Sequence, residues 1–250
     1  MLRLENLSKD FGGLRAVDNC SFEVPRHMIF GLIGPNGSGK STIFNLITAF
    51  LKPTSGKIFL KNREISDKKP HEINLMKLAR TFQLVKVFRN MTVMENLLLA
   101  PKNQAGENLL WAIVRPPSLR EVERENIRRA RELLDLIGLR GAENVQAGSL
   151  SYAEQKMIEL SRAIMTDPEI VLLDEPASGI NPTLMNRILD YIRGLRDRQG
   201  ITFLIVEHDM RVVMNLCERI AVLNYGQKIA EGTPAEISSD PLVIDAYLGV

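Results

Sequence analysis

A glycine-rich segment near the start of the chain constrains its fold more than any other feature. It follows the apolar residues 28–33, precedes the helix-like residues 43–47 and consists of Gly34, Pro35, Asn36, Gly37, Ser38, Gly39, Lys40, Ser41 and Thr42. Three glycines let the backbone wrap closely around a phosphate chain, so that backbone N–H groups and the following helix N-terminus point at the anion. The pattern predicts a P-loop in an α/β fold that binds a nucleotide.

Lys40 and Ser41 extend this prediction from phosphate to a nucleotide with its metal ion. The Lys40 ammonium can bridge the β- and γ-phosphates, and the Ser41 hydroxyl can bind Mg²⁺. A simple glycine turn between a strand and a helix would need neither side chain. We therefore expect a nucleotide with Mg²⁺ as the ligand.

The composition indicates a globular protein with a proper core. A chain of 250 residues with 45% hydrophobic content is long enough for one large α/β domain or a core with a smaller lobe. The formal net charge of +2, from 32 basic and 30 acidic residues, gives no sign of a nucleic-acid surface. The two cysteines, Cys20 and Cys217, are too few and too far apart for a disulfide framework, and we expect both to be small core residues.

No segment reads as a secretion signal or a membrane span. The N-terminus lacks the basic, apolar and small-residue order of a signal, and no apolar run approaches the roughly 18 residues that span a bilayer. Any work at a membrane is expected to go through a partner.

Apolar periodicity predicts alternating strands and helices. Strands are expected at residues 2–7, 21–24, 56–60, 169–175 and 201–206, with a hairpin over 220–230. Helices are expected over residues 71–79, 92–100, 120–138 and 184–195, after residue 150 and at the end of the chain. The first two strands predict an antiparallel patch beside the P-loop. Residues 101–119 are poorly periodic, and their apolar run 109–114 would either dock onto a partner or, as we favour, be buried in a helical lobe.

Asp174 and Glu175 end an apolar run that reads as a buried strand. Since a buried parallel strand is apolar throughout, carboxylates at its C-terminal end lie where open α/β sheets bind ligands. Asp174 fits the carboxylate on the Mg²⁺ side, reached through water. Glu175 fits a general base or water-positioning group for attack on the γ-phosphate. The alternative is a pair of acids in a turn.

Three further residues are candidates for the same site. Gln83 can orient water and touch Mg²⁺ through its carbonyl oxygen. His208 follows the buried strand 201–206, which makes it a candidate sensor of the γ-phosphate. Phe11 precedes a Gly12-Gly13 turn and would either stack on a purine ring or be a core residue.

Ser151 and Glu154 have the spacing of a helix capping box. One interpretation is a well-made helix start. The other is a second phosphate-binding helix N-terminus, with Ser151 and backbone N–H groups as donors. Spacing leaves both open, because a good cap and a good anion site share the same chemistry.

Taken together, the P-loop, the segment 150–155, the strand ending in Asp174-Glu175 and the later His208 resemble the ATP-binding subunits of ABC transporters. The resemblance covers essentially the whole chain. It implies an α/β P-loop NTPase cassette with a RecA-like core, an antiparallel β patch and a helical subdomain. As domain boundaries it implies a core lobe of residues 1–83 and 160–250 and a helical subdomain of about 84–159.

The same resemblance implies a role for each motif. Residues 34–42 become the Walker A motif for ATP, and residues 177–181 the D-loop. The remaining assignments are Phe11 as the adenine-stacking residue; Ser41, Gln83 and Asp174 around Mg²⁺; Glu175, His208 and Gln83 as catalytic residues; and Ser151, Tyr152, Ala153 and Glu154 as the signature loop, which acts on the nucleotide of a second subunit. It further implies an identical or paralogous ATPase partner, a membrane permease pair, indirectly a substrate-binding protein, and a peripheral place on the cytoplasmic face of the membrane.

Within that family, the chain looks most like the ATPases of branched-chain amino acid importers. The likeness lies in residues 11–17, 80–83, 101–119, 177–182 and 231–249. The lipopolysaccharide-export ATPase is similar in the same stretches. The resemblance therefore implies an importer ATPase, with the export type as the alternative.

The signature loop departs from the family pattern. Tyr152 and Ala153 stand where the family has two glycines, or tyrosine then glycine, and Asn181 ends the D-loop in place of the usual Asp. Glycine at the second position allows close approach of the backbone to the γ-phosphate, and a methyl group there is expected to push it away.

Three other functions are weighed against the importer ATPase. A soluble ABC-type ATPase of translation or DNA repair would usually carry two cassettes or a long coiled-coil insertion. A nucleotide-gated binding module with little turnover would have no need of Glu175 and His208. A P-loop kinase gives no account of residues 150–155 or of His208.

Overall fold

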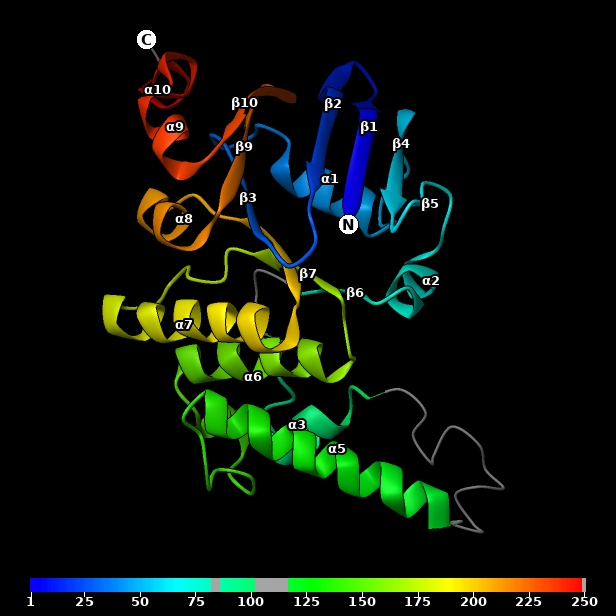
Figure 1. The fold of residues 1–250 in the computed structure, drawn as a ribbon, viewed down its shortest axis with the longest axis vertical. Helices are drawn as coiled ribbons and strands as arrows, with labels where there is room; N and C mark the ends of the chain where they lie inside the picture. The colour runs from blue at the N-terminus through cyan, green and yellow to red at the C-terminus, as the bar shows by residue number, and fades with distance from the viewer. Residues whose placement is uncertain (82–85, 102–116, 249–250) are drawn as a thin grey trace. The chain divides into compact units, whose positions relative to one another are not determined.

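The structure, a computed structural model, describes residues 1–81, 86–101 and 117–248. The chain divides into two compact units (Figure 1). Unit 1 comprises Met1–Arg80, Glu169–Ser178 and Ile192–Val250, and unit 2 comprises Thr81–Pro168 and Gly179–Tyr191. Unit 1 is therefore assembled from three separate stretches of chain.

The main sheet of unit 1 carries the P-loop strand at its centre. Its strand order is β10-β9-β3-β8-β7-β6. The strands are β3 (Ile29–Ile33), β6 (Leu78–Arg80), β7 (Ile170–Asp174), β8 (Thr202–Val206), β9 (Arg219–Asn224) and β10 (Gln227–Gly232). All neighbours are parallel except the β9–β10 hairpin. Both β3 and β8 are buried along their whole length, and all their residues except Thr202 at the start of β8 are apolar or glycine.

A second, antiparallel sheet confirms the predicted patch. Its order is β2-β1-β4-β5, with β1 (Leu2–Phe11), β2 (Leu14–Val24), β4 (Ser55–Leu60) and β5 (Arg63–Glu64). The strands β1 and β2 are longer than predicted because bulges interrupt their alternation. Asn6 and Asn19 each take a positive φ of 47° at register shifts between the strands.

The core of unit 1 lies between the two sheets and around the P-loop helix α1 (Lys40–Ile47). Phe22 of β2 and Phe30 of β3 stack at 5.7 Å between ring centres. Cys20 and Cys217 are buried as expected, and burial raises the pKa of each thiol to about 12. The other helices of this unit are α2 (Pro70–Leu75), α8 (Met210–Leu216), α9 (Pro234–Ser239) and α10 (Pro241–Leu248).

Unit 2 is helical. It contains α3 (Val93–Leu98), α5 (Pro117–Leu136), the 3₁₀ turn η2 (Ala147–Ser149) and α6 (Tyr152–Met165). The helices α3, α5 and α6 pack on one another. The helix α7 (Pro182–Gln199) begins in unit 2 and ends in unit 1. The predicted glycine stop of α5 is confirmed, since Gly138 takes a φ of 72°.

The helix predicted over residues 71–79 is wrong beyond Leu75. α2 ends there, Lys77 turns the chain with a φ of 70°, and residues 78–80 form β6 beside β7. Pairing with a distant strand overrides the local pattern at this point. The helix predicted over residues 92–100 has its capping box at Thr92 but ends at Leu98. The apolar run 109–114 lies outside the described residues.

Candidate nucleotide site

The P-loop connects the end of β3 to the start of α1. Gly34, Gly37 and Gly39 have φ angles of 150°, 80° and 102°, a region that side chains disfavour. Gly39 is the N-cap of α1 and has no side chain with which to cap it. The first backbone N–H groups of α1 are therefore left for an anion.

Two of these glycines are also required by packing. A Cβ added at Gly34 would lie 2.1 Å from the Leu223 carbonyl oxygen of β9, and one at Gly39 would lie 2.5 Å from that of Ala16 in β2. At Gly37, no atom of the described residues beyond its chain neighbours lies within 4 Å of an added Cβ. The loop is thus pressed against β9 and β2 at its ends and open at its middle.

The Lys40 side chain is buried and held by the loop itself. Its Nζ donates to the carbonyl oxygens of Gly34 and Pro35, both at 2.8 Å, and to Ser38 Oγ at 3.4 Å. Burial lowers the pKa of Lys40, while the charges of Glu175 and Asp174 act in the opposite direction. The ammonium is therefore already fixed at the loop where phosphates are expected.

Asp174 ends β7 and is paired with a residue that sequence reasoning missed. Arg80 Nη2 lies 3.2 Å from Asp174 Oδ2, and the two side chains are only 10% and 12% exposed. Burial raises the pKa of the Asp174 carboxyl, and the Arg80 guanidinium opposes that rise. No local pattern marks Arg80, since its partner comes from a distant strand.

Glu175 and His208 come together at the carboxyl ends of β7 and β8. The Nδ1 atom of His208 lies 3.3 Å from Glu175 Oε1. Glu175 has a left-handed backbone, with a φ of 49°, held by its N–H donating to the Val206 carbonyl at 2.9 Å. Such strain at a non-glycine residue is typical of functional sites.

Glu207 is a second residue that sequence reasoning missed. Its side chain is only 1% exposed, and its carboxylate accepts hydrogen bonds from the backbone N–H groups of Ala177 at 2.9 Å and His208 at 3.3 Å. Burial raises the pKa of Glu207. A carboxylate directly after an apolar strand was the available signal.

Phe11 lies at the end of β1, just before the predicted turn. Its ring is 45% exposed, and the Lys9 ammonium lies 5.2 Å from the ring centre. Phe11 is therefore not a core residue, and its ring presents area for stacking.

The remaining residues of the P-loop segment 34–42 differ in exposure. Asn36 and Ser41 are exposed, and Pro35 and Thr42 are half-buried. Gln83 lies outside the described residues.

In unit 2, Ser151 caps α6 and forms the predicted capping box. Its N–H donates to Glu154 Oε2 at 2.9 Å, and the Glu154 N–H donates to Ser151 Oγ at 3.4 Å. Tyr152 is exposed, with the Lys156 ammonium 5.4 Å from its ring centre. Ala153 is buried, at 4% exposure. The cap is formed, while the role toward a phosphate stays a prediction.

Residues 17–178 match the model of a family described as ABC transporter. The chain belongs to this family. Membership of the ABC family makes the chain an ATP-binding ATPase. A second model, described as branched-chain amino acid ATP-binding cassette transporter, matches residues 227–250.

Named relatives of this ABC protein match it from end to end. The high-affinity branched-chain amino acid transport ATP-binding protein LivG of Salmonella typhimurium is 44% identical over 249 residues, covering 100% of this chain and 98% of the relative. The crystal structure of the ADP conformation of an ATP-binding cassette of an ABC transporter has a TM-score of 0.86 at 37% identity, covering 100% and 99% of the two chains. A dimeric post-hydrolysis ABC cassette bound to ADP and Pi has a TM-score of 0.75 at 26% identity, covering 94% and 99%.

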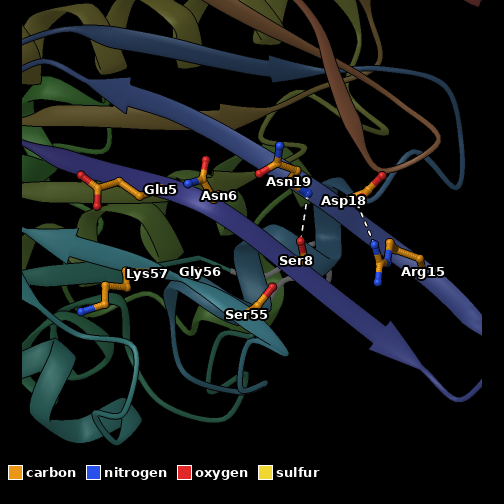
Figure 2. A pocket seen from close by; sticks show the side chains of 9 residues that line it. All are labelled: Glu5, Asn6, Ser8, Arg15, Asp18, Asn19, Ser55, Gly56 and Lys57. Atoms are coloured by element: carbon orange, nitrogen blue, oxygen red, sulfur yellow. Dashed lines mark hydrogen bonds and ion pairs between the residues drawn. The ribbon is translucent and has the colours of Figure 1, made fainter.

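A polar hollow of about 500 Å³ lies on the antiparallel sheet of this ABC protein (Figure 2). Its lining includes two acids and two bases, and each has a partner: Glu5 with Arg3 at 3.1 Å, Arg15 with Asp10 at 2.9 Å and Asp18 at 3.1 Å, and Lys57 with Glu64 at 3.0 Å. Ser8 Oγ also accepts the N–H of Asn19 at 2.9 Å. The charged side chains of the lining are thus paired with one another or with neighbouring residues of the same sheet.

Proposed function

We propose that the chain is the ATP-hydrolysing subunit of an ABC importer for branched-chain or related amino acids. The observation that carries this proposal is the end-to-end match to LivG at 44% identity. The match of residues 227–250 to the branched-chain amino acid model supports it independently. In this proposal, ATP-driven closure of two ATPase subunits drives a membrane permease.

ATP is proposed to lie with its phosphates on the P-loop and its base against Phe11. The open middle of the loop at Gly37 and the uncapped start of α1 support the first contact. The exposed ring of Phe11 supports the second. Lys40 would exchange its carbonyl partners for phosphate oxygens.

The oxygen donors near the P-loop fit a magnesium site shared with phosphates. Mg²⁺ is usually held by one or two carboxylates together with substrate phosphates and water. Ser41, in the first turn of α1, and Asp174, at the end of β7, supply a hydroxyl and a carboxylate, and Gln83 is proposed as a third donor. When bound, Mg²⁺ supplies neutralisation of charge on the transferring phosphoryl group.

Glu175 is proposed to orient the water that attacks the γ-phosphate. Its carboxylate stands at the edge of the sheet where α/β folds bind ligands, and the His208 ring lies against it at 3.3 Å. His208 would then hold the carboxylate in position and sense the γ-phosphate. This division of roles gives one group for the water and one for the response to nucleotide.

The partners are proposed from the ABC family. A second ATPase subunit would place its signature loop, Ser151 to Glu154 here, over the nucleotide of this one, and the dimeric cassette among the similar structures supports such pairing. No helix in residues 1–81, 86–101 and 117–248 is both long and apolar enough to cross a bilayer. We propose that permease subunits hold the chain at the cytoplasmic face of the membrane and that a binding protein delivers the solute. As domain boundaries we further propose a core lobe of residues 1–83 and 160–250 and a helical subdomain of about residues 84–159.

Mg²⁺-ATPase assays of the purified chain test the enzymatic half of the proposal. Glu175→Gln should lower turnover by about 10²- to 10⁴-fold, as expected for loss of a proton-transfer group. Glu64→Gln, on the exposed strand β5, is the matched control and should leave turnover unchanged. Equal turnover of the Glu175→Gln and wild-type chains would refute the assignment of Glu175.

Transport assays test the choice of solute. The chain would be reconstituted with its permease and binding protein in vesicles, and ATP-dependent uptake of labelled leucine measured. Uptake that disappears with Glu175→Gln supports import of branched-chain amino acids. Stimulation of its ATPase by a lipopolysaccharide-export permease, without amino-acid uptake, would contradict it.

A further inference from the structure

One guanidinium joins three elements around the nucleotide site. Arg80, the last residue of β6, donates through Nη1 to Asn45 Oδ1 at 2.7 Å and Thr48 Oγ1 at 3.1 Å on α1. Through Nη2 it donates to Asp174 Oδ2 at 3.2 Å at the end of β7. The P-loop helix and the strand that carries Asp174 are therefore connected by a single side chain.

The Arg80 guanidinium is held in a fixed place. Its centre lies 5.6 Å from the ring centre of Phe44 and 5.9 Å from that of Phe50. A planar guanidinium can stack on aromatic rings while its edge donates in several directions, which the point charge of a lysine cannot do. The contacts to Asn45 and Asp174 thus depend on arginine in particular.

We infer that Arg80 is a positioning residue for Asp174. The inference rests on the proposed function, in which Ser41 of α1 and Asp174 of β7 both face Mg²⁺. Because Arg80 binds α1 and the Asp174 carboxylate together, it fixes the distance between these two donors. It also donates to Oδ2 of Asp174, and we assign Oδ1 to the hydrated ion.

A purely structural role explains this arrangement less well. A buried ion pair is a weak source of stability, because desolvating both charges offsets their attraction. If Arg80 instead competed with the metal ion for Asp174, removing Arg80 would tighten the Mg²⁺-dependent binding of nucleotide.

Binding of a fluorescent ATP analogue, in Mg²⁺ and in EDTA, separates these roles. The Arg80→Gln and Arg80→Lys variants should lose about tenfold or more of the tightening that Mg²⁺ gives, the usual cost of removing a partner behind a metal ligand. Their affinity in EDTA should stay at the wild-type value. The control is Arg219→Gln, which breaks a 3.0 Å pair with Glu231 on the β9–β10 hairpin and should change neither affinity.

A double-mutant cycle tests whether Arg80 acts through Asp174. The Mg²⁺ effect is the ratio of the nucleotide affinity in Mg²⁺ to that in EDTA. In an Asp174→Asn background, Arg80→Gln should reduce this Mg²⁺ effect no further. An additive loss, an unchanged Mg²⁺ effect or tighter Mg²⁺-dependent binding in the Arg80 variants would overturn the inference.

Asn45→Ala covers the case in which the Arg80 variants fail to fold. It removes the shorter of the two hydrogen bonds from Arg80 to α1, at 2.7 Å, and keeps the bond to Thr48 and the ion pair, so it should weaken the Mg²⁺ effect in the same direction but by less. An unchanged Mg²⁺ effect in Asn45→Ala would overturn the inference. A wild-type chain that binds no ATP would refute the proposed function as well, whereas normal wild-type binding with insensitive variants refutes the inference alone.

Discussion

The Glu207 carboxylate accepts a hydrogen bond from the backbone N–H of Ala177 at 2.9 Å. Its other oxygen accepts the N–H of His208 at 3.3 Å. Glu207 ends the apolar run of β8, while Ala177 follows the turn at Glu175. One buried carboxylate therefore ties together the backbones that carry Glu175 and His208.

Replacing Glu207 by glutamine should remove a pH dependence of stability. Burial raises the pKa of Glu207 above its ordinary 4.5, so between pH 4.5 and the raised pKa the folded chain binds more protons at this side chain than the unfolded chain does. The resulting stabilisation is present below pH 4.5 and is lost as the pH rises through the raised pKa. Urea unfolding at several pH values should show wild-type stability falling relative to Glu207→Gln over this window. A difference in unfolding free energy between the wild type and Glu207→Gln that does not vary with pH would contradict the prediction.

Alanine at Gly39 should be much more damaging than alanine at Gly37. Both residues have positive φ, so each substitution carries the left-handed penalty of about 1–2 kcal/mol. Only at Gly39 does the new Cβ also meet a backbone atom, the Ala16 oxygen at 2.5 Å. Chemical denaturation should therefore give a larger loss of unfolding free energy for Gly39→Ala. Equal losses would show that the loop moves away from β2 without cost.

Lys40→Met should abolish most ATP binding while the chain stays folded. The ammonium contributes hydrogen bonds from a charged group, and losing one such bond to phosphate costs about 1.5–3 kcal/mol, or roughly tenfold to a hundredfold in affinity. Isothermal titration with ATP measures the affinity, and circular dichroism checks the fold. Wild-type affinity in Lys40→Met would mean that the ammonium stays with the carbonyls of Gly34 and Pro35 when nucleotide binds.

Ala153→Gly should lower stability without raising ATPase activity. Ala153 lies in the first turn of α6 with its methyl group buried, so glycine there costs up to about 1 kcal/mol of helix stability. Because Ala153 is only 4% exposed, we expect its methyl group not to reach a nucleotide on a second subunit, which is the opposite of the effect expected from the sequence pattern. ATPase assays of the chain alone and mixed with a paralogous ATPase check this. A silent wild type that becomes active with glycine would show that Ala153 disables the loop.

The features predicted correctly from the sequence depend on local chemistry. The P-loop strand, the acids that end β7 and the capping box at Ser151 each follow from neighbouring residues and their spacing. Arg80 and Glu207 were missed because their partners, Asp174 and Ala177, lie far away in the chain. The helix predicted over residues 71–79 failed for the same reason, since β7 decides that residues 78–80 form a strand.

The P-loop also has a place in the order of synthesis. Its own residues emerge early, but the Leu223 carbonyl that packs against Gly34 and the Gly226 N–H that donates to the Ser38 carbonyl at 3.1 Å emerge near the end. The same is true of β8 and β9, the two neighbours of the P-loop strand β3. A growing chain on the ribosome therefore cannot complete the packing of its glycine-rich loop until the β9–β10 hairpin has been made.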